Sequence, residues 1–457
     1  MSETKGVAPR APLQGDGVVH TEERTSPVYT PSVIEEIQDK AALGRYRIRG
    51  FGTLRAKPLP SLDDLTFLPA SLTRIPLEGY REKCVTTTVL GTKYAEKPVT
   101  LDIPVMITGM SYGALSRNAK VALAAGAAMV GGSTTSGDGG MLEAEREASK
   151  TMIVEVLPSR YGYNIHHLRR ADAIELTIGQ GAKPGTGGLL LGTKISAEIA
   201  KIRELPAGVD QRSPARHPDF LGPDDMIIKI EELREATDGK VPIFVKIGAT
   251  RVFDDVKLAV KCGADVVVVD GMEGGTAASP ELMQDHTGIP TLAAIPEARR
   301  GLEDVGAYGQ VQLIAAGGIR SGVDVAKALA LGADACYIGT AGLIALNCNA
   351  PLYLEDYHAL GTRPGHCHHC HTGRCPVGIT TQDPELMKRL PIEEASLRVA
   401  NFLLAMTLEV QMIARSCGKS NVHDLDPDDL RALTMEAAAI TRIPLVGTSW
   451  YPGMGAH

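Results

Sequence analysis

Short aliphatic runs alternate with alanine-rich stretches of helical character from about Ile103 onward. We count eight runs, at Pro104–Gly109, Ala127–Gly132, Thr151–Val156, Ala173–Ile178, Val241–Ile247, Asp265–Asp270, Val311–Ala316 and Ala335–Gly339. Nearly continuous apolar strands separated by helices are typical of a parallel sheet that is buried on both faces. Eight such units within about 240 residues predict an α/β protein with the (β/α)8 barrel, or TIM barrel, architecture.

An open, doubly wound sheet is the alternative fold. However, no GxGxxG motif opens the first helix, as a dinucleotide-binding sheet of that kind would require. Glycine or polar residues end nearly every run, and in a barrel those ends meet at one mouth, where active sites are built. We therefore expect the barrel.

The rest of the chain suggests three further parts. We expect residues 1–100 to form an N-terminal arm (1–30) and a packing segment, 101–345 the barrel, 346–390 a cysteine-rich loop and 391–457 C-terminal helices. The packing segment contains a predicted helix at Pro31–Ala42 and a predicted strand at Cys84–Leu90. A long helix is predicted over residues 391–417 and a second over Asp426–Ile440, and one side of the long helix carries Leu397, Leu404, Leu408 and Met412.

Charge and hydropathy exclude two classes of partner. The net charge is −7 and no basic stripe with interleaved aromatic residues occurs, so nucleic acid is not expected as a ligand. The N-terminus lacks the apolar core of a signal peptide. The longest apolar run, Ala335–Cys348, is too short to cross a bilayer. We expect a cytoplasmic protein with no membrane partner.

Two glycine-bearing turns follow the seventh and eighth runs, at Gly317-Gly318 and at Gly339-Thr340. Glycine lets backbone N–H groups approach a phosphate, and barrels commonly bind phosphate after strands seven and eight. Small, donor-rich loops follow other runs and suit a planar ring, with a sugar phosphate as the competing ligand. These loops contain Met110, Ser111, Thr134, Thr135, Gln180, Gly274, Gly275 and Thr276.

Two lysines lie where solvent is not expected. Lys183 stands in the Gly/Pro-rich loop Gln180–Gly185, and Lys246 lies inside the apolar run Ile243–Ile247. A lysine in such surroundings must find an anion or lose its charge. A structural ion pair is one interpretation, and stabilisation of a reduced, anionic flavin is the other.

Four of the eight cysteines gather late in the chain, at Cys348, Cys367, Cys370 and Cys375. The spacing C-x2-C-x4-C followed by Pro is typical of iron–sulfur ligation. The interleaved histidines keep zinc as an alternative.

Together these motifs resemble the FMN-binding synthase domain of glutamate synthases. The resemblance covers residues 100–415 and rests on Met110–Ser116, Ser136–Gly140, Gln180–Gly185, Gly274–Pro280 and Cys370–Gly378. It implies FMN at the C-terminal mouth of the barrel and a [3Fe-4S] cluster beside it. It further implies electron transfer from cluster to flavin, which reduces 2-iminoglutarate to glutamate.

The sequence departs from the family pattern at the substrate. Asp138 replaces a glutamate and is shorter by one methylene, and Leu189 replaces a glutamine. Arg203 matches the arginine that binds the substrate carboxylate. The expected catalytic residues are therefore Lys183, Arg203 and Asp138. An insertion follows Cys348, so either Cys348 or Cys367 completes a [3Fe-4S] site with Cys370 and Cys375, or both serve a [4Fe-4S] cluster.

Neither a catalytic-cysteine amidotransferase domain nor a dinucleotide fingerprint is found in the sequence. We therefore expect a hetero-oligomer with separate amidotransferase-like and ferredoxin-like subunits. Stand-alone barrels of this kind resemble the large subunits of N-methylglutamate synthases, which exchange the amine of glutamate for methylamine. The alternatives are a glutamate synthase subunit that uses 2-oxoglutarate and ammonia, and a non-catalytic electron-relay subunit.

Overall fold

The computed structural model describes residues 28–55, 58–79 and 81–454. Most of the predicted arm at 1–30 lies outside the described residues. The chain divides into two compact units, residues 1–47 and residues 48–457. In the first, helix α1 (Pro31–Leu43) begins at the Thr30 cap and ends at Gly44, whose φ of 62° suits glycine.

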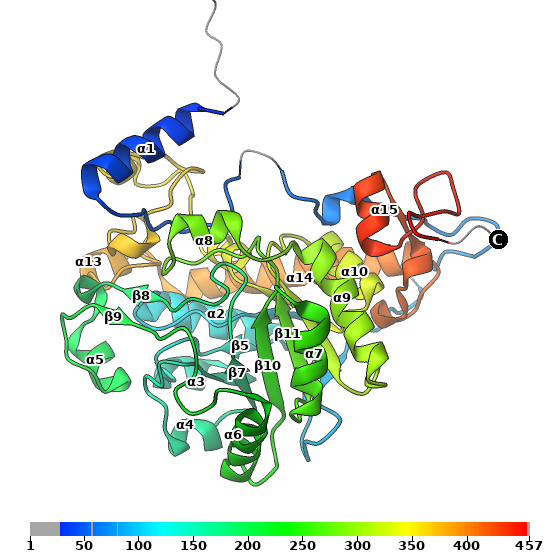
Figure 1. Cartoon of the computed structure of the whole chain (residues 1–457), viewed down its shortest axis with the longest axis horizontal. Helices are drawn as coiled ribbons and strands as arrows, with labels where there is room; N and C mark the ends of the chain where they lie inside the picture. The colour runs from blue at the N-terminus through cyan, green and yellow to red at the C-terminus, as the bar shows by residue number, and fades with distance from the viewer. Residues whose placement is uncertain (1–27, 56–57, 80, 455–457) are drawn as a thin grey trace, which may run out of the picture. The chain divides into compact units, whose positions relative to one another are not determined.

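The second unit contains the barrel. Its eight parallel strands are hydrogen-bonded in the order β4-β13-β12-β11-β10-β7-β6-β5 (Figure 1). The Ile107 N–H, at the end of β4, donates to the Ser133 carbonyl next to β5 at 3.0 Å and so closes the ring. The strands are β4 (Val105–Ile107), β5 (Thr134–Thr135), β6 (Met152–Val156), β7 (Ala173–Thr177), β10 (Ile243–Gly248), β11 (Val266–Asp270), β12 (Gln312–Ala316) and β13 (Ala335–Ile338). The predicted (β/α)8 barrel is confirmed.

Alternate side chains of each strand fill the barrel interior. A buried cluster there includes Met106, Phe244 and Ile314, together with Leu90 and Leu101. The latter two come from the hairpin of β2 (Thr88–Leu90) and β3 (Val99–Leu101), and the Gly91 N–H donates to the Gln312 side chain at 2.7 Å. The hairpin therefore packs into the interior core, which leaves the strands' carboxyl ends for the site.

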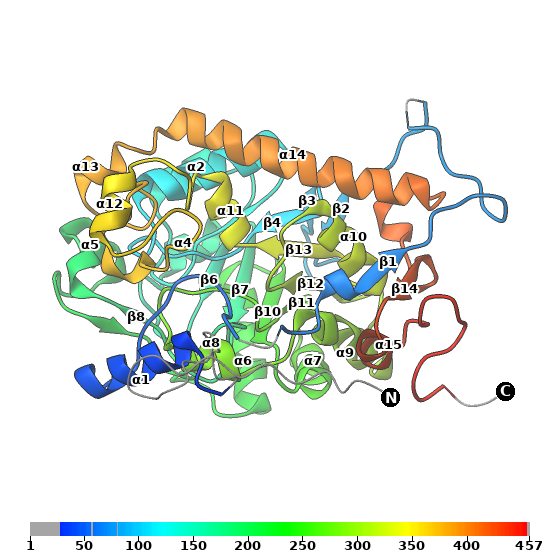
Figure 2. The ribbon, with the colours of Figure 1, turned by 90° about the horizontal axis from the view of Figure 1, so that it is seen from above.

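Helices cover the outside of the sheet (Figure 2). The main ones are α2 (Arg117–Met129), α3 (Glu143–Ala148), α4 (Ile165–Arg169), α6 (Pro223–Ala236), α7 (Val252–Lys261), α9 (Thr291–Asp304), α10 (Gly322–Leu331) and α14 (Ile392–Ser416). Shorter elements, with η for a 3-10 helix, are η1 (Leu62–Asp64), β1 (Leu65–Phe67), β8 (Leu189–Leu190), η2 (Gly192–Lys194), α5 (Ala197–Arg203), β9 (Gln211–Arg212), α8 (Glu281–His286), α11 (Thr340–Ala345), α12 (Leu354–Ala359), η3 (Cys370–Thr372), α13 (Pro384–Met387), η4 (Val422–Asp424), η5 (Pro427–Asp429), β14 (Leu430–Ala432) and α15 (Met435–Thr441).

Helix α14 packs on α2 and α10 with its small residues inward. A Cβ on Gly126 would lie 2.6 Å from the Val399 side chain, and one on Gly322 would lie 2.0 Å from the Met406 carbonyl. The stripe from Leu397 to Met412 faces outward, with Met412 70% exposed. Within the described ranges α14 alone is long and apolar enough to cross a membrane, although its inner face is part of the barrel's packing.

Two boundaries predicted from the sequence are wrong. Ala127–Gly132 is not the second strand, because Ala127–Met129 complete α2 and a turn at Gly131 (φ 68°) precedes β5. The predicted helix Asp426–Ile440 is instead a 3-10 turn, the strand β14 and the short helix α15. The Thr434 side chain caps α15 and sets its start.

Candidate active site

One large cavity, of about 980 Å³, opens at the carboxyl ends of the barrel strands. Each of the eight strands, or the loop that follows it, contributes at least one lining residue. This is the end of a TIM barrel at which active sites are found. The cavity is large enough for a cofactor and a small substrate together.

The structure brings most of the predicted residues to this cavity. Those that line it are Met110, Ser111, Asp138, Gln180, Lys183, Arg203, Lys246, Gly274, Gly275, Thr276, Gly317, Gly318, Gly339, Thr340 and Cys370. Thr134 and Thr135 do not. Thr134 Oγ1 donates to the buried Glu145 carboxylate at 3.2 Å, and Thr135 Oγ1 donates to the Ile107 carbonyl at 2.9 Å. Both hydroxyls are therefore used inside the barrel wall.

A buried group of charges lies at the floor of the cavity. Lys246 Nζ donates to Thr108 Oγ1 at 3.1 Å and lies 3.5 Å from the Glu175 carboxylate and 3.6 Å from that of Glu155. Burial alone would lower the pKa of Lys246, but the two carboxylates outweigh it and raise that pKa. Lys246 thus has a structural ion pair and also lines the cavity.

Two carboxylates share this one lysine. Glu155 and Glu175 are paired across β6 and β7, and the Tyr337 hydroxyl donates to Glu175 at 2.8 Å. Neither carboxyl oxygen of Glu155 has a hydrogen-bond partner among the described residues. Burial raises the pKa of Glu155 to about 8, and the nearby Glu175 carboxylate adds to the rise. Both causes favour the protonated form of the Glu155 carboxyl group.

The glycine turns after β12 and β13 form a cradle at one end of the cavity. Gly317 has a φ of 99°, and a Cβ there would lie 2.6 Å from the Gly271 carbonyl oxygen. Gly318 also has a positive φ, of 72°. Only glycine fits this close approach of two backbones without strain. The turn therefore exposes backbone to the cavity, as a bound phosphate group would require.

Lys183 and Arg203 add two more cations at the cavity, of which Arg203 is buried and Lys183 half-buried. The Lys183 ammonium makes no hydrogen bond or ion pair within the described part of the chain, and burial lowers its pKa. Arg203 is held by the carbonyls of Tyr112 and Asp138, both at 2.9 Å, and by the Gln211 side chain at 3.1 Å. Its Nε is buried without a partner. Both side chains can bind an anionic substrate.

Asp138 is positioned by two hydroxyls that the sequence did not reveal. Ser159 Oγ donates to one carboxylate oxygen at 2.5 Å, and Ser213 Oγ donates to the other at 2.6 Å. Leu189, on the short strand β8, lines the cavity near this group. No local motif identified the serines, since they follow different elements of the barrel.

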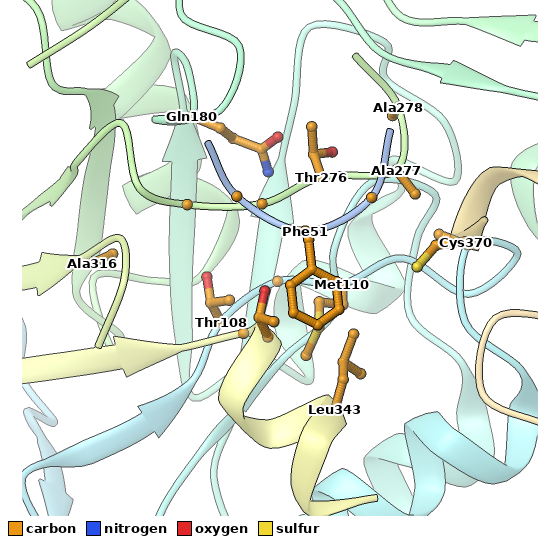
Figure 3. A pocket seen from close by; sticks show the side chains of 18 of the residues that line it. Phe51, Thr108, Met110, Gln180, Thr276, Ala277, Ala278, Ala316, Leu343 and Cys370 are labelled. Atoms are coloured by element: carbon orange, nitrogen blue, oxygen red, sulfur yellow. The ribbon is translucent and has the colours of Figure 1, made fainter. Parts of the chain in front are cut away.

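Phe51 is a further lining residue that the sequence did not reveal. Its ring lies in the cavity with Thr108, Met110 and Leu343 around it (Figure 3). It belongs to a segment without helical or strand periodicity, so its position depends on tertiary contacts alone.

The four clustered cysteines line a second, small cavity of about 20 Å³. Burial, and then the neighbouring thiols, raise the pKa of Cys370 to about 12. The Lys194 ammonium lies beside this loop and donates to the Cys370 carbonyl at 3.0 Å. Within the described ranges no three Cys, His, Asp or Glu side chains are arranged to hold one metal ion. The thiols therefore share a cavity without forming a closed site for a single ion.

Comparison with known proteins identifies the family. Residues 57–420 match the model of the conserved region in glutamate synthase. The chain belongs to the glutamate synthase family. It is 58% identical over 436 residues to the "Glutamate synthase large subunit-like protein" of Rhizobium meliloti (strain 1021), covering 95% of this chain and 98% of that relative.

More distant members of the glutamate synthase family also match. An "Archaeal glutamate synthase (NADPH)" of Methanocaldococcus jannaschii is 36% identical over 428 residues, covering 88% of this chain and 81% of the relative. Among solved structures, a flavocytochrome b2 variant with sulfite bound has a TM-score of 0.53 at 17% identity, covering 90% of this chain and 87% of its own. A putative lactate oxidase of Pediococcus acidilactici has a TM-score of 0.50 at 16% identity, covering 82% of this chain and 84% of its own. These two likenesses concern the barrel fold alone.

Proposed function

We propose that the cavity binds FMN and that the chain is the flavin subunit of an N-methylglutamate synthase. The observation that carries the proposal is the convergence of Lys183, Arg203 and Lys246 on one cavity at the strands' carboxyl ends. Lys246 is already paired with two carboxylates, but Lys183 and Arg203 leave positive charge at the cavity that favours anionic ligands. A phosphate, a ring that gains negative charge and a dicarboxylic substrate would satisfy them together.

The residues at the cavity divide between cofactor and substrate in this proposal. Gly317, Gly318 and Thr340 would hold the phosphate, and Lys246 with Thr108 would face the pyrimidine side of the ring. FMN, when bound, supplies reversible two-electron transfer to the α-carbon of the amino acid.

Arg203 and Lys183 would bind the carboxylates of glutamate. Lys183 is also placed to hold or release a proton near the amine, because burial lowers its pKa and its ammonium has no hydrogen-bond or ion-pair partner among the described residues. Asp138, fixed by Ser159 and Ser213, and Leu189 would form the wall around the reacting nitrogen.

We further propose that the cysteine cavity holds an iron–sulfur cluster. An all-thiol donor set favours iron–sulfur chemistry over the oxygen-rich sites of harder metals. Cys370 lines both cavities, which supports a cluster adjacent to the flavin. Cys375 would be a second ligand, with Cys348, Cys367 or both completing the set; the nearby Lys194 ammonium would balance thiolate charge.

The partners in this proposal are separate amidotransferase-like and ferredoxin-like subunits. The competing function, glutamate formation from 2-oxoglutarate and ammonia, is supported by the name of the archaeal relative. The shortened Asp138 and the apolar Leu189 favour a methylated amine instead. Retention of Lys183 and Arg203 at the cavity is evidence against a non-catalytic relay.

The decisive assay uses the purified complex. Glutamate with methylamine should give N-methylglutamate and ammonia, measured by mass spectrometry with 15N-labelled glutamate. Rapid glutamate formation from 2-oxoglutarate and glutamine, without amine exchange, would instead assign the competing function. The variant Arg203→Lys, which keeps the charge but loses the planar fork, should weaken glutamate binding in either case.

A further inference from the structure

Residues 48–54 form a strap along the cavity wall. Gly50, Phe51, Gly52 and Thr53 all line the cavity, although they precede the first barrel strand by about fifty residues. The predicted packing segment therefore contributes directly to the site. The strap is also pinned and closely packed on both sides.

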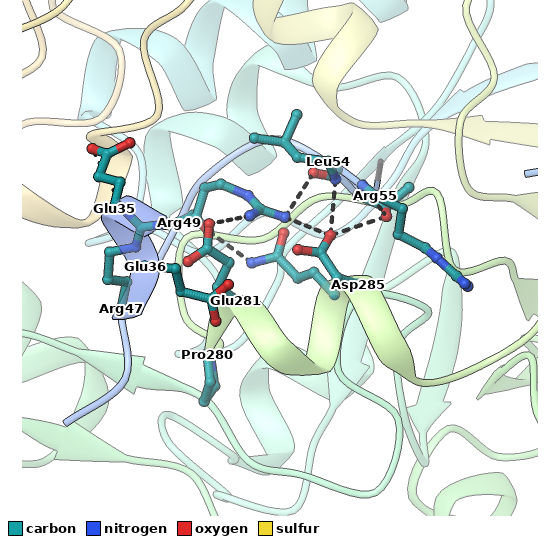
Figure 4. Close-up of polar contacts among 12 residues, drawn as sticks. Glu35, Glu36, Arg47, Arg49, Leu54, Arg55, Pro280, Glu281 and Asp285 are labelled. Atoms are coloured by element: carbon teal, nitrogen blue, oxygen red, sulfur yellow. Dashed lines mark hydrogen bonds and ion pairs between the residues drawn. The ribbon is translucent and has the colours of Figure 1, made fainter. Parts of the chain in front are cut away.

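The strap is anchored by the buried side chain of Arg49, which is 5% exposed (Figure 4). Its guanidinium pairs with the Glu281 carboxylate and, at 2.8 Å, with Asp285 Oδ1 on α8. The same Asp285 oxygen accepts hydrogen bonds from Thr53 Oγ1 at 3.0 Å and from the Leu54 N–H at 2.8 Å. One helix thus fixes both ends of the strap.

Two glycines allow the strap to lie against its neighbours. A Cβ on Gly50 would lie 2.7 Å from Cys370 Sγ, and one on Gly52 would lie 2.2 Å from the Glu273 carbonyl oxygen. The Gly50 N–H also donates to the His368 carbonyl at 2.9 Å. The strap is therefore wedged between the cysteine loop and the loop after β11.

Phe51, between these glycines, has a left-handed backbone with a φ of 53°. This conformation costs a bulky residue roughly 1–2 kcal/mol, so the surrounding contacts must hold it. The conformation turns the ring into the cavity, where Figure 3 shows it close to Met110 and Leu343. The ring also meets His368 edge-on, with centroids 5.7 Å apart. The Phe51 ring thus forms part of the cavity wall, on a strained backbone segment that the Arg49 ion pairs anchor.

We propose that this strap excludes water from the reacting imine, with Phe51 as the side chain that closes the wall. The inference rests on the proposed amine exchange. An imine carbon attacked by water gives a ketone: the water oxygen becomes the carbonyl oxygen, and the nitrogen leaves as the amine with both water hydrogens. That hydrolysis would release 2-oxoglutarate and leave the two electrons on the reduced cofactor. An enclosed apolar wall suppresses this side reaction.

The test compares Phe51→Ala with Phe51→Leu and with Phe253→Ala, a half-buried phenylalanine on α7 that does not line the cavity. One readout is the ratio of 2-oxoglutarate to N-methylglutamate formed. The other is quenching of flavin fluorescence by iodide, which reports access without turnover. We expect Phe51→Ala to raise the ratio by about tenfold and to increase quenching, because the wall is opened. In Phe51→Leu both readouts should stay close to the wild-type values, and in Phe253→Ala both should equal the wild-type values.

Arg49→Lys provides a second variant, since a lysine cannot reach both carboxylates as a fork. It should loosen the strap and change both readouts in the same direction as Phe51→Ala. An unchanged ratio and unchanged quenching in Phe51→Ala, with exchange intact, would overturn the strap inference alone. If the wild type performs no exchange but Phe51→Ala still increases quenching, the proposed function is overturned and the wall stays in place. A protein that binds no flavin overturns both.

Discussion

Glu155→Gln should make the protein's stability less dependent on pH. The Glu155 carboxyl group is buried beside Glu175, and its pKa rises from 4.5 to about 8. A raised carboxyl pKa stabilises the folded protein below the unfolded value, and that stability is lost as pH rises through the folded value. The window is therefore pH 4.5 to 8. Glutamine keeps the shape of the acid without the ionisation.

The magnitude follows from about 1.4 kcal/mol per pH unit inside this window. Between pH 5 and pH 7 the wild type should lose on the order of 2 kcal/mol of unfolding free energy that the glutamine variant retains. Urea unfolding at the two pH values measures the difference directly, and Glu147→Gln, at an exposed position on α3, is the control. Parallel pH dependence of wild type and Glu155→Gln would refute the protonated carboxyl at the cavity floor.

Three further outcomes are expected. Cys370→Ser should abolish the absorbance of an iron–sulfur cluster together with its acid-labile sulfide, whereas stoichiometric zinc without sulfide would support the alternative metal. Asp138→Glu combined with Leu189→Gln should shift amine preference from methylamine toward ammonia by about tenfold or less, because one buried methyl group is worth roughly 1 kcal/mol. An unchanged preference in competition assays would show that these positions do not contact the amine. Gly126→Ala should lower unfolding free energy by about 1–3 kcal/mol, because the new methyl meets Val399; a stability equal to wild type would show that α14 can move away at little cost.

The sequence predicted the barrel because parallel strands buried on both faces leave a strong signal of apolar runs. It also identified the Gly317-Gly318 turn and the two lysines, which line the cavity, because glycine pairs and a lysine inside an apolar run are unusual in those positions. Other features depend on contacts between distant segments. The stripe on α14 is exposed because the helix packs its other side, which includes Ala400 and Leu403, against the barrel.

Parts of the site could not be predicted for the same reason. Ser159 and Ser213 reach Asp138 from separate loops, and neither belongs to a motif. Phe51 precedes the barrel, and its neighbour Arg49 is ion-paired with two carboxylates of α8. Thr135 was expected at the cofactor, but its hydroxyl is used within the barrel wall. Loop residues of this kind carry no periodic signal that would reveal their direction.

The central claim is that the cavity at the strands' carboxyl ends is a flavin site. Acid or heat should release the cofactor from the purified complex, and chromatography with mass detection identifies it. We predict FMN, at about one per copy of this chain. A chain that contains FAD, or that remains empty after incubation with FMN, would contradict the account.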